Sequence, residues 1–149
     1  MGAHATFPVN VHLVLMNTKN EILLLHRLNT GIYDGYWGLP AGKVDVGESP
    51  QQAMIREARE ELNITIQPAF GSVFVYKTES MLYPGTLWHD INFFFCASES
   101  NVHAINNEPS KHSEIRWFSL SDLPKNLIPV CRRGIEQVEQ KVWYGEDGF

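Results

Sequence analysis

The sequence predicts an α/β fold, because segments with the pattern of β-strands occur together with two segments that have the pattern of helices. Apolar residues alternate over residues 9–16, a well-capped helix begins at residue 50, and a second amphipathic helix is expected over residues 129–144. A length of 149 residues suits one domain with its own hydrophobic core. We therefore expect a single domain over residues 1–149.

The first two strands are expected to form a β-hairpin. Residues 9–16 place alternate apolar side chains on one side, and residues 17–20 are typical of a polar turn before a second strand at 21–28. The run Leu23-Leu24-Leu25 is continuous, which indicates a strand covered on both faces. The glycine-containing residues 29–36 are expected to form a loop.

The first helix carries start and stop signals at both ends. Ser49 suits the N-cap, Pro50 suits the first helical position, and Gln52 stands where the partner in a capping box belongs. Asn63 follows Leu62 and can take the left-handed conformation that ends a helix. These signals predict a helix that starts at residue 50 and stops before residue 63.

Three glutamates gather on this predicted helix. At 100° per residue, Glu57, Glu60 and Glu61 fan over about 100°, roughly opposite the expected apolar face. The like-charge i,i+4 pair costs a few tenths of a kcal/mol, and a glutamate in the last turn costs about 0.3–1 kcal/mol against the helix dipole. The expected apolar face consists of Ile55, Ala58 and Leu62.

Two interpretations of these carboxylates are open from the helix alone. A divalent cation would turn their repulsion into a set of ligands, and such violations of local rules are expected at functional sites. The alternative is a solvated acidic face balanced by Arg56 and Arg59, since Arg56 and Glu60 form a permitted i,i+4 pair.

The residues from 42 to 64 recur at fixed spacings. Five residues separate Gly42 from Glu48, and seven more precede the run Arg56-Glu57-Ala58, which continues through Glu60-Glu61 to Asn63-Ile64. This pattern resembles the Nudix box, and the preceding segment 37–42 resembles the family's entry to it. Asn63 stands where the family usually has Gly, and Ala58 stands where a larger aliphatic residue is common. Neither departure touches the acidic set.

The resemblance implies a MutT-like Nudix hydrolase, with an α/β/α sandwich around a mixed β-sheet. It implies that Glu57, Glu60 and Glu61, with the carbonyl of Gly42, bind Mg²⁺, in whose place Mn²⁺ could act. The expected support of this site is an ion pair between Glu48 and Arg56.

Catalytic roles follow from the same resemblance. Glu60 or Glu61 is expected to act as metal ligand and as general base, with Glu114 as the other candidate base. Family members often bring an extra acidic residue from outside the box, and Glu108 is a further candidate for it. Alternatively, Glu108 and Glu114 are solvated carboxylates of a loop and a strand edge.

Three residues before the box are candidates for substrate binding. Arg27 ends the second strand, where many Nudix relatives carry a basic residue near the phosphates, although an ordinary strand-end arginine is the alternative. Tyr36 or Trp37 could stack on a base, but aromatic residues in such a place also support loops.

The chain after the first helix is expected to supply further strands and the closing helix. β-Branched and aromatic residues predict two strands, and polar residues predict the loops between them. The expected strands are 64–77, 87–97 and 114–118, the loops are 79–85 and 98–113, and the helix is 129–144.

Composition narrows the class of protein. A net charge of −5 argues against a protein that binds nucleic acid along a basic surface. Cys96 and Cys131 form no disulfide framework, which favours a reducing, cytoplasmic setting. No apolar run approaches the ~20 residues of a membrane span, and residues 1–10 lack the pattern of a signal peptide.

The expected activity is Mg²⁺-dependent hydrolysis of a nucleoside diphosphate linked to another group, X. We expect a nucleoside triphosphate as the small-molecule partner, cleaved to monophosphate and pyrophosphate. Hydrolysis of ADP-ribose or a nucleotide sugar, a non-catalytic nucleotide-sensing module, and an isomerase of isopentenyl diphosphate are the alternatives. A homodimer is compatible with the sequence.

Overall fold

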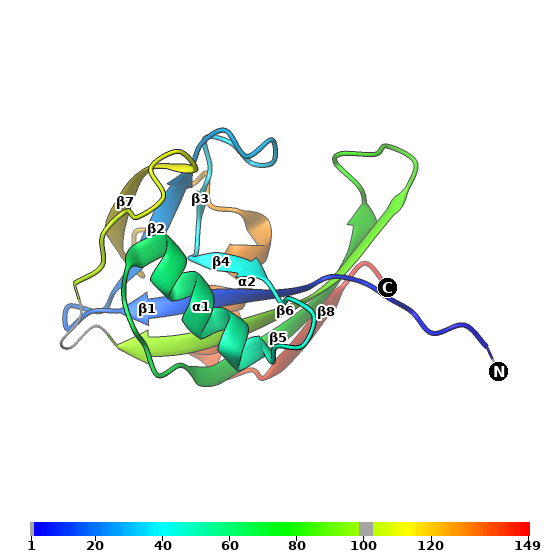
Figure 1. Cartoon of the computed structure of the whole chain (residues 1–149), viewed down its shortest axis with the longest axis horizontal. Helices are drawn as coiled ribbons and strands as arrows, with labels where there is room; N and C mark the ends of the chain where they lie inside the picture. The colour runs from blue at the N-terminus through cyan, green and yellow to red at the C-terminus, as the bar shows by residue number, and fades with distance from the viewer. Residues whose placement is uncertain (1, 99–102) are drawn as a thin grey trace.

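The computed structural model describes residues 2–98 and 103–149, and in these residues two helices cover opposite faces of one mixed β-sheet (Figure 1). Helix α1 (Pro50–Leu62) packs on one face and helix α2 (Pro129–Gln140) packs on the other. The predicted α/β/α sandwich around a mixed sheet is therefore confirmed. Neither described helix is long and apolar enough to cross a membrane.

The sheet has the strand order β3-β2-β1-β6-β5-β8, with β4 paired to β1 and β7 paired to β2. The pairs β1–β6 and β5–β8 are parallel and the others are antiparallel. The strands are β1 (Val9–Met16), β2 (Glu21–Arg27), β3 (Trp37–Gly38), β4 (Ala41–Lys43), β5 (Ala69–Glu79), β6 (Leu87–Ser98), β7 (His112–Ser119) and β8 (Tyr144–Asp147).

The predicted hairpin and its doubly covered strand are both present. Strands β1 and β2 pair antiparallel. Leu23 and Leu25 belong to the core under α1, whereas Ile22 and Leu24 belong to the core under α2. A strand whose alternate side chains enter two cores has no polar face, which explains the continuous apolar run.

Helix α1 begins and ends at the predicted signals. The backbone N–H of Gln52 donates to the Ser49 hydroxyl (3.1 Å), and the Gln52 side chain accepts from the Ser49 N–H (2.8 Å), so the capping box is complete. Asn63 adopts the left-handed conformation with φ of 55°. This confirms that Asn takes the backbone geometry that Gly would supply.

The C-terminal segment differs from the prediction, because α2 stops at Gln140. Lys141 takes a left-handed conformation (φ 56°) that no glycine or asparagine signals, and Tyr144–Asp147 then pairs with β5 as strand β8. The prediction of a helix to residue 144 is therefore wrong at its end. Of the predicted loop 98–113, residues 99–102 lie outside the described residues.

Candidate active site

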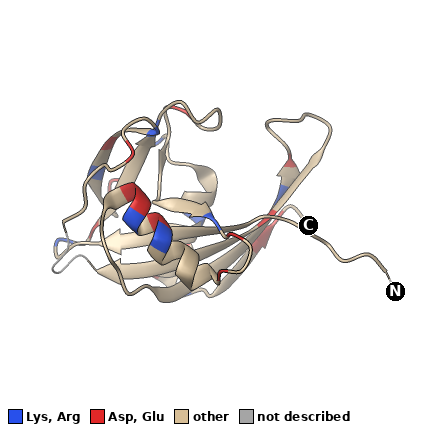
Figure 2. Ribbon diagram, in the orientation of Figure 1, with Lys and Arg blue, Asp and Glu red and all other residues tan. Residues whose placement is uncertain are grey.

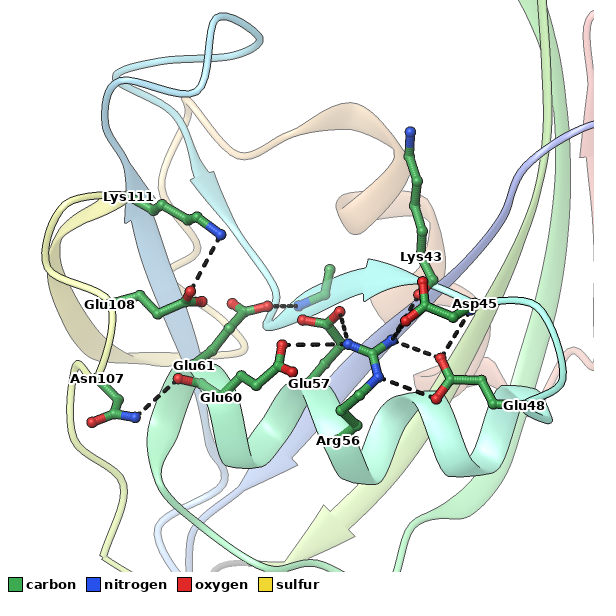
Figure 3. A network of polar contacts seen from close by, with 11 residues as sticks. Lys43, Asp45, Glu48, Arg56, Glu57, Glu60, Glu61, Asn107, Glu108 and Lys111 are labelled. Atoms are coloured by element: carbon green, nitrogen blue, oxygen red, sulfur yellow. Dashed lines mark hydrogen bonds and ion pairs between the residues drawn. The ribbon is translucent and has the colours of Figure 1, made fainter.

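The acidic cluster consists of Glu57, Glu60, Glu61 and Glu108, whose carboxylates turn toward one region beside α1 (Figure 3). The sequence placed all three helix glutamates opposite the buried face of α1, but the structure does so only in part, since Glu60 is exposed and Glu61 is not. Glu61 is only 4% exposed and lies within the buried face. The predicted apolar face was incomplete, because the buried side also includes Ala53 and Met54.

Strand β4 provides the space for these carboxylates. A Cβ on Gly42 would overlap the Glu57 carboxylate, so only glycine lets β4 approach the helix this closely. The backbone N–H of Ala41 donates to Glu61 Oε1 (3.1 Å). The strand therefore fixes two glutamates, one by contact and one by a hydrogen bond.

The hydrogen-bond pattern of β4 shows which carbonyl faces this region. The Leu13 N–H donates to the Pro40 carbonyl (2.8 Å) and the Val44 N–H to the Val9 carbonyl (2.9 Å), so the pair Val11 and Gly42 between them is also hydrogen-bonded. The Gly42 carbonyl thus points toward β1 rather than toward the cluster.

The carbonyl of Ala41, the next residue, is the one that turns away from β1. Its N–H already reaches Glu61, and the N–H and C=O of a strand residue point to the same side. The Ala41 carbonyl, rather than the Gly42 carbonyl expected from the sequence, is therefore the one that faces the cluster, and this direction could not be read before the register of β4 was known.

Arg56 connects the cluster to the loop before the helix. Its guanidinium binds Glu48 (Nη2–Oε1 2.6 Å, Nε–Oε2 3.1 Å), Glu57 (2.7 Å) and Glu60 (3.3 Å). It also donates to the Lys43 carbonyl (3.0 Å). The structure thus brings Glu48 and Arg56 together as expected, and acidic and basic residues lie side by side on α1 (Figure 2).

Burial disfavours the ionised forms of two glutamates of the cluster. Burial, followed by repulsion from Glu57, raises the pKa of Glu61 well above its usual value, and burial also raises the pKa of Glu57. His112 Nε2 lies 3.7 Å from Glu61 Oε2, but burial lowers the pKa of His112 to about 4. The imidazole is therefore neutral near pH 7, and this contact does not act as an ion pair.

The loop before β7 caps the C-terminal end of α1. The backbone N–H groups of Ile105 and Asn107 donate to the carbonyls of Leu62 (3.1 Å) and Glu61 (2.9 Å). The side chain of Asn107 donates to the Glu60 carbonyl (3.1 Å). These bonds satisfy helix carbonyls that would otherwise lack partners, and they hold the following residue at the cluster.

That following residue is Glu108, which pairs with Lys111 (3.2 Å). Glu114, the other predicted acidic residue, lies elsewhere: its carboxylate pairs with Arg116 (3.0 Å). Ile115 and Trp117 pack on the α1 side of the sheet, so the alternating Glu114 faces the opposite side. The structure brings Glu108 to the cluster and not Glu114, which corrects the choice of candidate base.

A cavity of about 420 Å³ opens on the α2 side of the sheet, and β4 separates it from the acidic cluster. Arg27 and Lys43 line it, and neither pairs with a carboxylate within the described part of the chain. Its aromatic lining comprises Tyr33, Tyr76 and Trp88.

The predicted stacking residues lie outside this cavity. Trp37 is 6% exposed and packs edge-on against His26 and Phe118 in the core. Tyr36 packs edge-on against Tyr33, in a separate hollow beside α2. The structure thus places neither residue in the cavity, and stacking on a base stays a prediction for both. The polar positions that interrupt the apolar strands β1 and β6 were the signal in the sequence that was missed.

A family model for the NUDIX domain matches residues 6–138. The chain belongs to the Nudix family. It is a Nudix hydrolase, which acts on phosphoric anhydride bonds, and it falls among the pyrophosphohydrolases of that family.

Individual relatives agree with this family. An RNA pyrophosphohydrolase of Rhizobium meliloti (strain 1021) is 30% identical over 148 residues, covering 86% of this chain and 88% of the relative. A putative 8-oxo-dGTP diphosphatase of Bacillus subtilis (strain 168) is 27% identical over 124 residues, covering 82% and 73%. The crystal structure of a MutT NUDIX hydrolase from Burkholderia pseudomallei has a TM-score of 0.76 and 30% identity, covering 90% of this chain and 99% of that one.

Nudix hydrolases generally use a divalent metal, and the residues of this site suit one. Buried carboxylates with raised pKa values and a backbone carbonyl are hard oxygen donors, the ligands of Mg²⁺ and Mn²⁺. In the described residues no three His, Cys, Asp or Glu side chains form a ready-made ligand group. Arg56 holds Glu57 and Glu60, and Mg²⁺ needs only one or two carboxylates beside water and phosphate oxygens.

Proposed function

We propose that this Nudix hydrolase cleaves a nucleoside diphosphate linked to a group X, with a nucleoside triphosphate as the main substrate and monophosphate and pyrophosphate as products. The observation that supports it is the convergence of Glu57, Glu61 and Glu108 on one side of β4. Beside them lies a cavity with two basic residues that pair with no carboxylate in the described part of the chain. The names of the relatives, an RNA pyrophosphohydrolase and a putative 8-oxo-dGTP diphosphatase, agree with a phosphoanhydride on a nucleotide.

Glu57, Glu60 and Glu61, with the Ala41 carbonyl, would hold Mg²⁺ or Mn²⁺. The metal supplies charge neutralisation of the diphosphate and lowers the pKa of bound water. Arg56 keeps Glu57 and Glu60 in place through its bonds to both and to Glu48. Fixing the ligands in advance lowers the reorganisation that binding would otherwise require.

Glu108 is the general base in this proposal. Its carboxylate lies 3.2 Å from Lys111 Nζ and turns toward the cluster, where a carboxylate can accept a proton from water. The caps at the end of α1 hold it on the same side as Glu61. Its role takes the place of the one expected for Glu114, whose carboxylate faces the opposite side of the sheet from the cluster.

The phosphates of the substrate, which lie between its nucleobase and the metal, would contact Arg27 and Lys43. The Arg27 Nε donates to the Ile32 carbonyl (3.0 Å), which orients the guanidinium along the cavity wall and leaves its terminal N–H groups for a ligand. Lys43 lies on β4, next to Gly42, so its ammonium can reach phosphates that cross this strand. Positive groups on both sides of the cavity fit a polyphosphate.

The setting we propose is cytoplasmic. Both Cys96 and Cys131 are free thiols, as a reducing compartment requires.

The test is a hydrolysis screen of the purified protein with Mg²⁺ or Mn²⁺. The panel includes nucleoside triphosphates, ADP-ribose, nucleotide sugars, dinucleoside polyphosphates and an RNA with a 5′-triphosphate, with products separated by ion-exchange chromatography. We expect monophosphate and pyrophosphate from triphosphates, and no product when EDTA is added. Faster cleavage of ADP-ribose or a nucleotide sugar would make that compound the main substrate in place of a triphosphate. Tight binding without any product would favour a sensing module.

Variants of helix α1 test whether its glutamates are needed for hydrolysis. Glu60→Gln and Glu61→Gln are expected to keep the fold and lower kcat by roughly 10²- to 10³-fold, as removal of preorganised charged groups does. Arg59→Gln is the matched control, because Arg59 lies on the same helix and within the described residues its side chain hydrogen-bonds to Thr65 (3.4 Å) and not to the acidic cluster. Full activity in both glutamate variants would contradict the assignment.

A further inference from the structure

One wall of the cavity carries a network of polar side chains from β1 and β6, which we call the polar floor: Asn10, Trp88, Asp90 and Asn92. Asp90 and Asn92 are 6% and 1% exposed, so these groups lie almost wholly inside the protein. A buried polar group is costly unless it is hydrogen-bonded, and polar residues here interrupt two otherwise apolar strands. The position inside a ligand-sized cavity suggests a role beyond packing.

The carboxylate of Asp90 is the centre of the polar floor. Its Oδ2 accepts from Asn10 Nδ2 (3.0 Å) and from Trp88 Nε1 (2.9 Å). Its Oδ1 accepts from Asn92 Nδ2 (2.8 Å). Three donors on one carboxylate also fix the orientation of both amides, because a flipped amide would bring an oxygen against the carboxylate.

Every N–H group of the polar floor is already donated inside the protein. The second Asn10 hydrogen goes to Asn92 Oδ1 (3.2 Å), and the second Asn92 hydrogen goes to the Phe74 carbonyl (3.3 Å). His12 Nε2 lies 2.9 Å from Asn92 Oδ1, so this nitrogen carries the proton and the Asn92 oxygen is also saturated. No donor of the network remains for a ligand.

Acceptor capacity does remain. A carboxylate has about four acceptor positions, of which three are used on Asp90, and an amide oxygen has about two, which are open on Asn10 within the described structure. The polar floor therefore presents only acceptors to the cavity. It suits a ligand edge with N–H donors and repels an edge made of carbonyl oxygens.

Resting on the proposed function, we propose that the polar floor selects nucleotides whose base carries an exocyclic amino group, over uracil and thymine. The amino group of cytosine, adenine or guanine donates to Asp90 or Asn10. Uracil and thymine place a carbonyl oxygen at the corresponding edge, against acceptors that have no proton to give. Asp90 and Asn10 are thus specificity-determining residues, and they take no part in the cleavage itself.

The polar floor is placed so that base and phosphates can be bound together. Asn10 on β1 is the register partner of Lys43 on β4, the strand that borders the acidic cluster. Phosphates attached to a base on the polar floor can therefore reach Lys43, with the metal ligands beyond it. Tyr33, Tyr76 and Trp88 supply the aromatic walls that suit a flat ring.

The first experiment compares ligands with and without the amino group, with the wild-type protein. ATP and purine riboside triphosphate differ in that group alone, whereas CTP and UTP also differ in the proton at N3. The pairs are CTP against UTP and ATP against purine riboside triphosphate, measured as kcat/KM and as inhibition constants of the non-hydrolysable α,β-methylene analogues. We expect the amino-bearing member to be preferred by roughly 10- to 100-fold, the range of a hydrogen bond to a charged group. Equal values, or a preference for the partner without the amino group, in the pair with the higher turnover would overturn the inference.

The second experiment changes the polar floor. Asn10→Leu removes the open amide oxygen at a half-buried position, together with the Nδ2 bonds to Asp90 and Asn92. Asp90→Asn replaces the carboxylate by an amide that also carries donors. Both variants are expected to bring the ratio of kcat/KM between the two ligands of a pair closer to 1, with a larger effect for Asp90→Asn. Glu79→Gln is the matched control, because Glu79 also lines the cavity but its carboxylate accepts from the Gly85 N–H (2.7 Å) outside the polar floor. An unchanged preference in a folded Asn10 variant and a folded Asp90 variant would contradict the assignment.

The two proposals fail in different ways. If no phosphoanhydride is cleaved but the analogues still bind with the amino preference, the selectivity stands and the proposed function falls. If all bases are cleaved alike, the proposed function stands and the polar floor has no selective role. Should Asp90→Asn not fold, the wild-type ligand pairs and Asn10→Leu still decide the question.

Discussion

Gly42 and Glu57 lie in such close contact that the position of a Cβ on residue 42 is already taken by the Glu57 carboxylate. Gly42→Ala is therefore expected to displace the carboxylate by about the width of a methyl group, and a misplacement of about 1 Å lowers a rate by roughly 10²-fold. The measurement is kcat/KM with saturating Mg²⁺, together with a thermal melt to show that the variant folds. Wild-type activity would show that Glu57 has freedom to move at no cost.

A compensating change tests the same contact from the other side. Asp is one methylene shorter than Glu, so the double variant Gly42→Ala/Glu57→Asp is expected to be more active than the product of the single effects predicts. Strict additivity would argue that the two residues act independently.

The base is distinguished by two matched variants. Glu108→Gln is expected to lower kcat by roughly 10²- to 10⁴-fold and leave KM nearly unchanged, since it removes a proton acceptor but keeps the shape of the side chain. Glu114→Gln should retain activity, because its carboxylate pairs with Arg116 on the opposite side of the sheet. The reverse result would restore Glu114 as the base.

Sequence reasoning located residues whose interaction partners lie nearby along the chain. It missed residues whose partners lie far away along the chain. The caps of α1 at Ser49 and Asn63 depend on neighbours within one turn, and both were predictable. The placement of Glu108 depends on hydrogen bonds from its loop to the end of a helix more than 40 residues earlier, as in Asn107 to Glu60. No local pattern encodes such a contact.

The polar floor and the Ala41 carbonyl were missed for a related reason. The direction of a backbone carbonyl depends on the register of β4 against β1, which three-residue strands do not signal in sequence. Asn10 and Asp90 stand 80 residues apart and meet only because β1 and β6 pair in parallel. Their polarity was visible in the sequence, but their common function was not.

Metal binding should raise the thermal stability of the protein. Burial raises the pKa of Glu61, so the folded protein disfavours the ionised carboxylate, and a bound cation favours that form. Saturating Mg²⁺ at ~100 times its Kd would add about 2.7 kcal/mol to the free energy of unfolding, which is roughly 5–10 °C in Tm. Differential scanning fluorimetry with and without EDTA measures the shift.

The control for this measurement is Glu61→Gln. The amide keeps an oxygen for the Ala41 N–H and carries no charge, so the metal-free variant should melt higher than the metal-free wild type. It should also lose most of the Mg²⁺ shift. A lower Tm without metal would show that the carboxylate stabilises the fold by itself.

Stability should also fall on the acid side, because of His12. Its imidazole is buried between Asn92 and Phe94, and burial lowers its pKa below the usual 6.5. The unfolded chain therefore binds a proton at a pH where the folded protein does not, and the free energy of unfolding falls as the pH drops below about 6.5. The nearby Asp90 opposes this shift and Arg27 reinforces it, but desolvation is the larger cause.

Urea unfolding in EDTA at several values between pH 7 and pH 5 measures how steeply the free energy of unfolding falls with pH. His12→Gln is the control, because glutamine can still donate to Asn92 and does not titrate, so the free energy of unfolding of this variant should fall less steeply as the pH drops. An equal pH dependence in both proteins would assign the acid sensitivity to other groups, with the buried His112 as the first to examine.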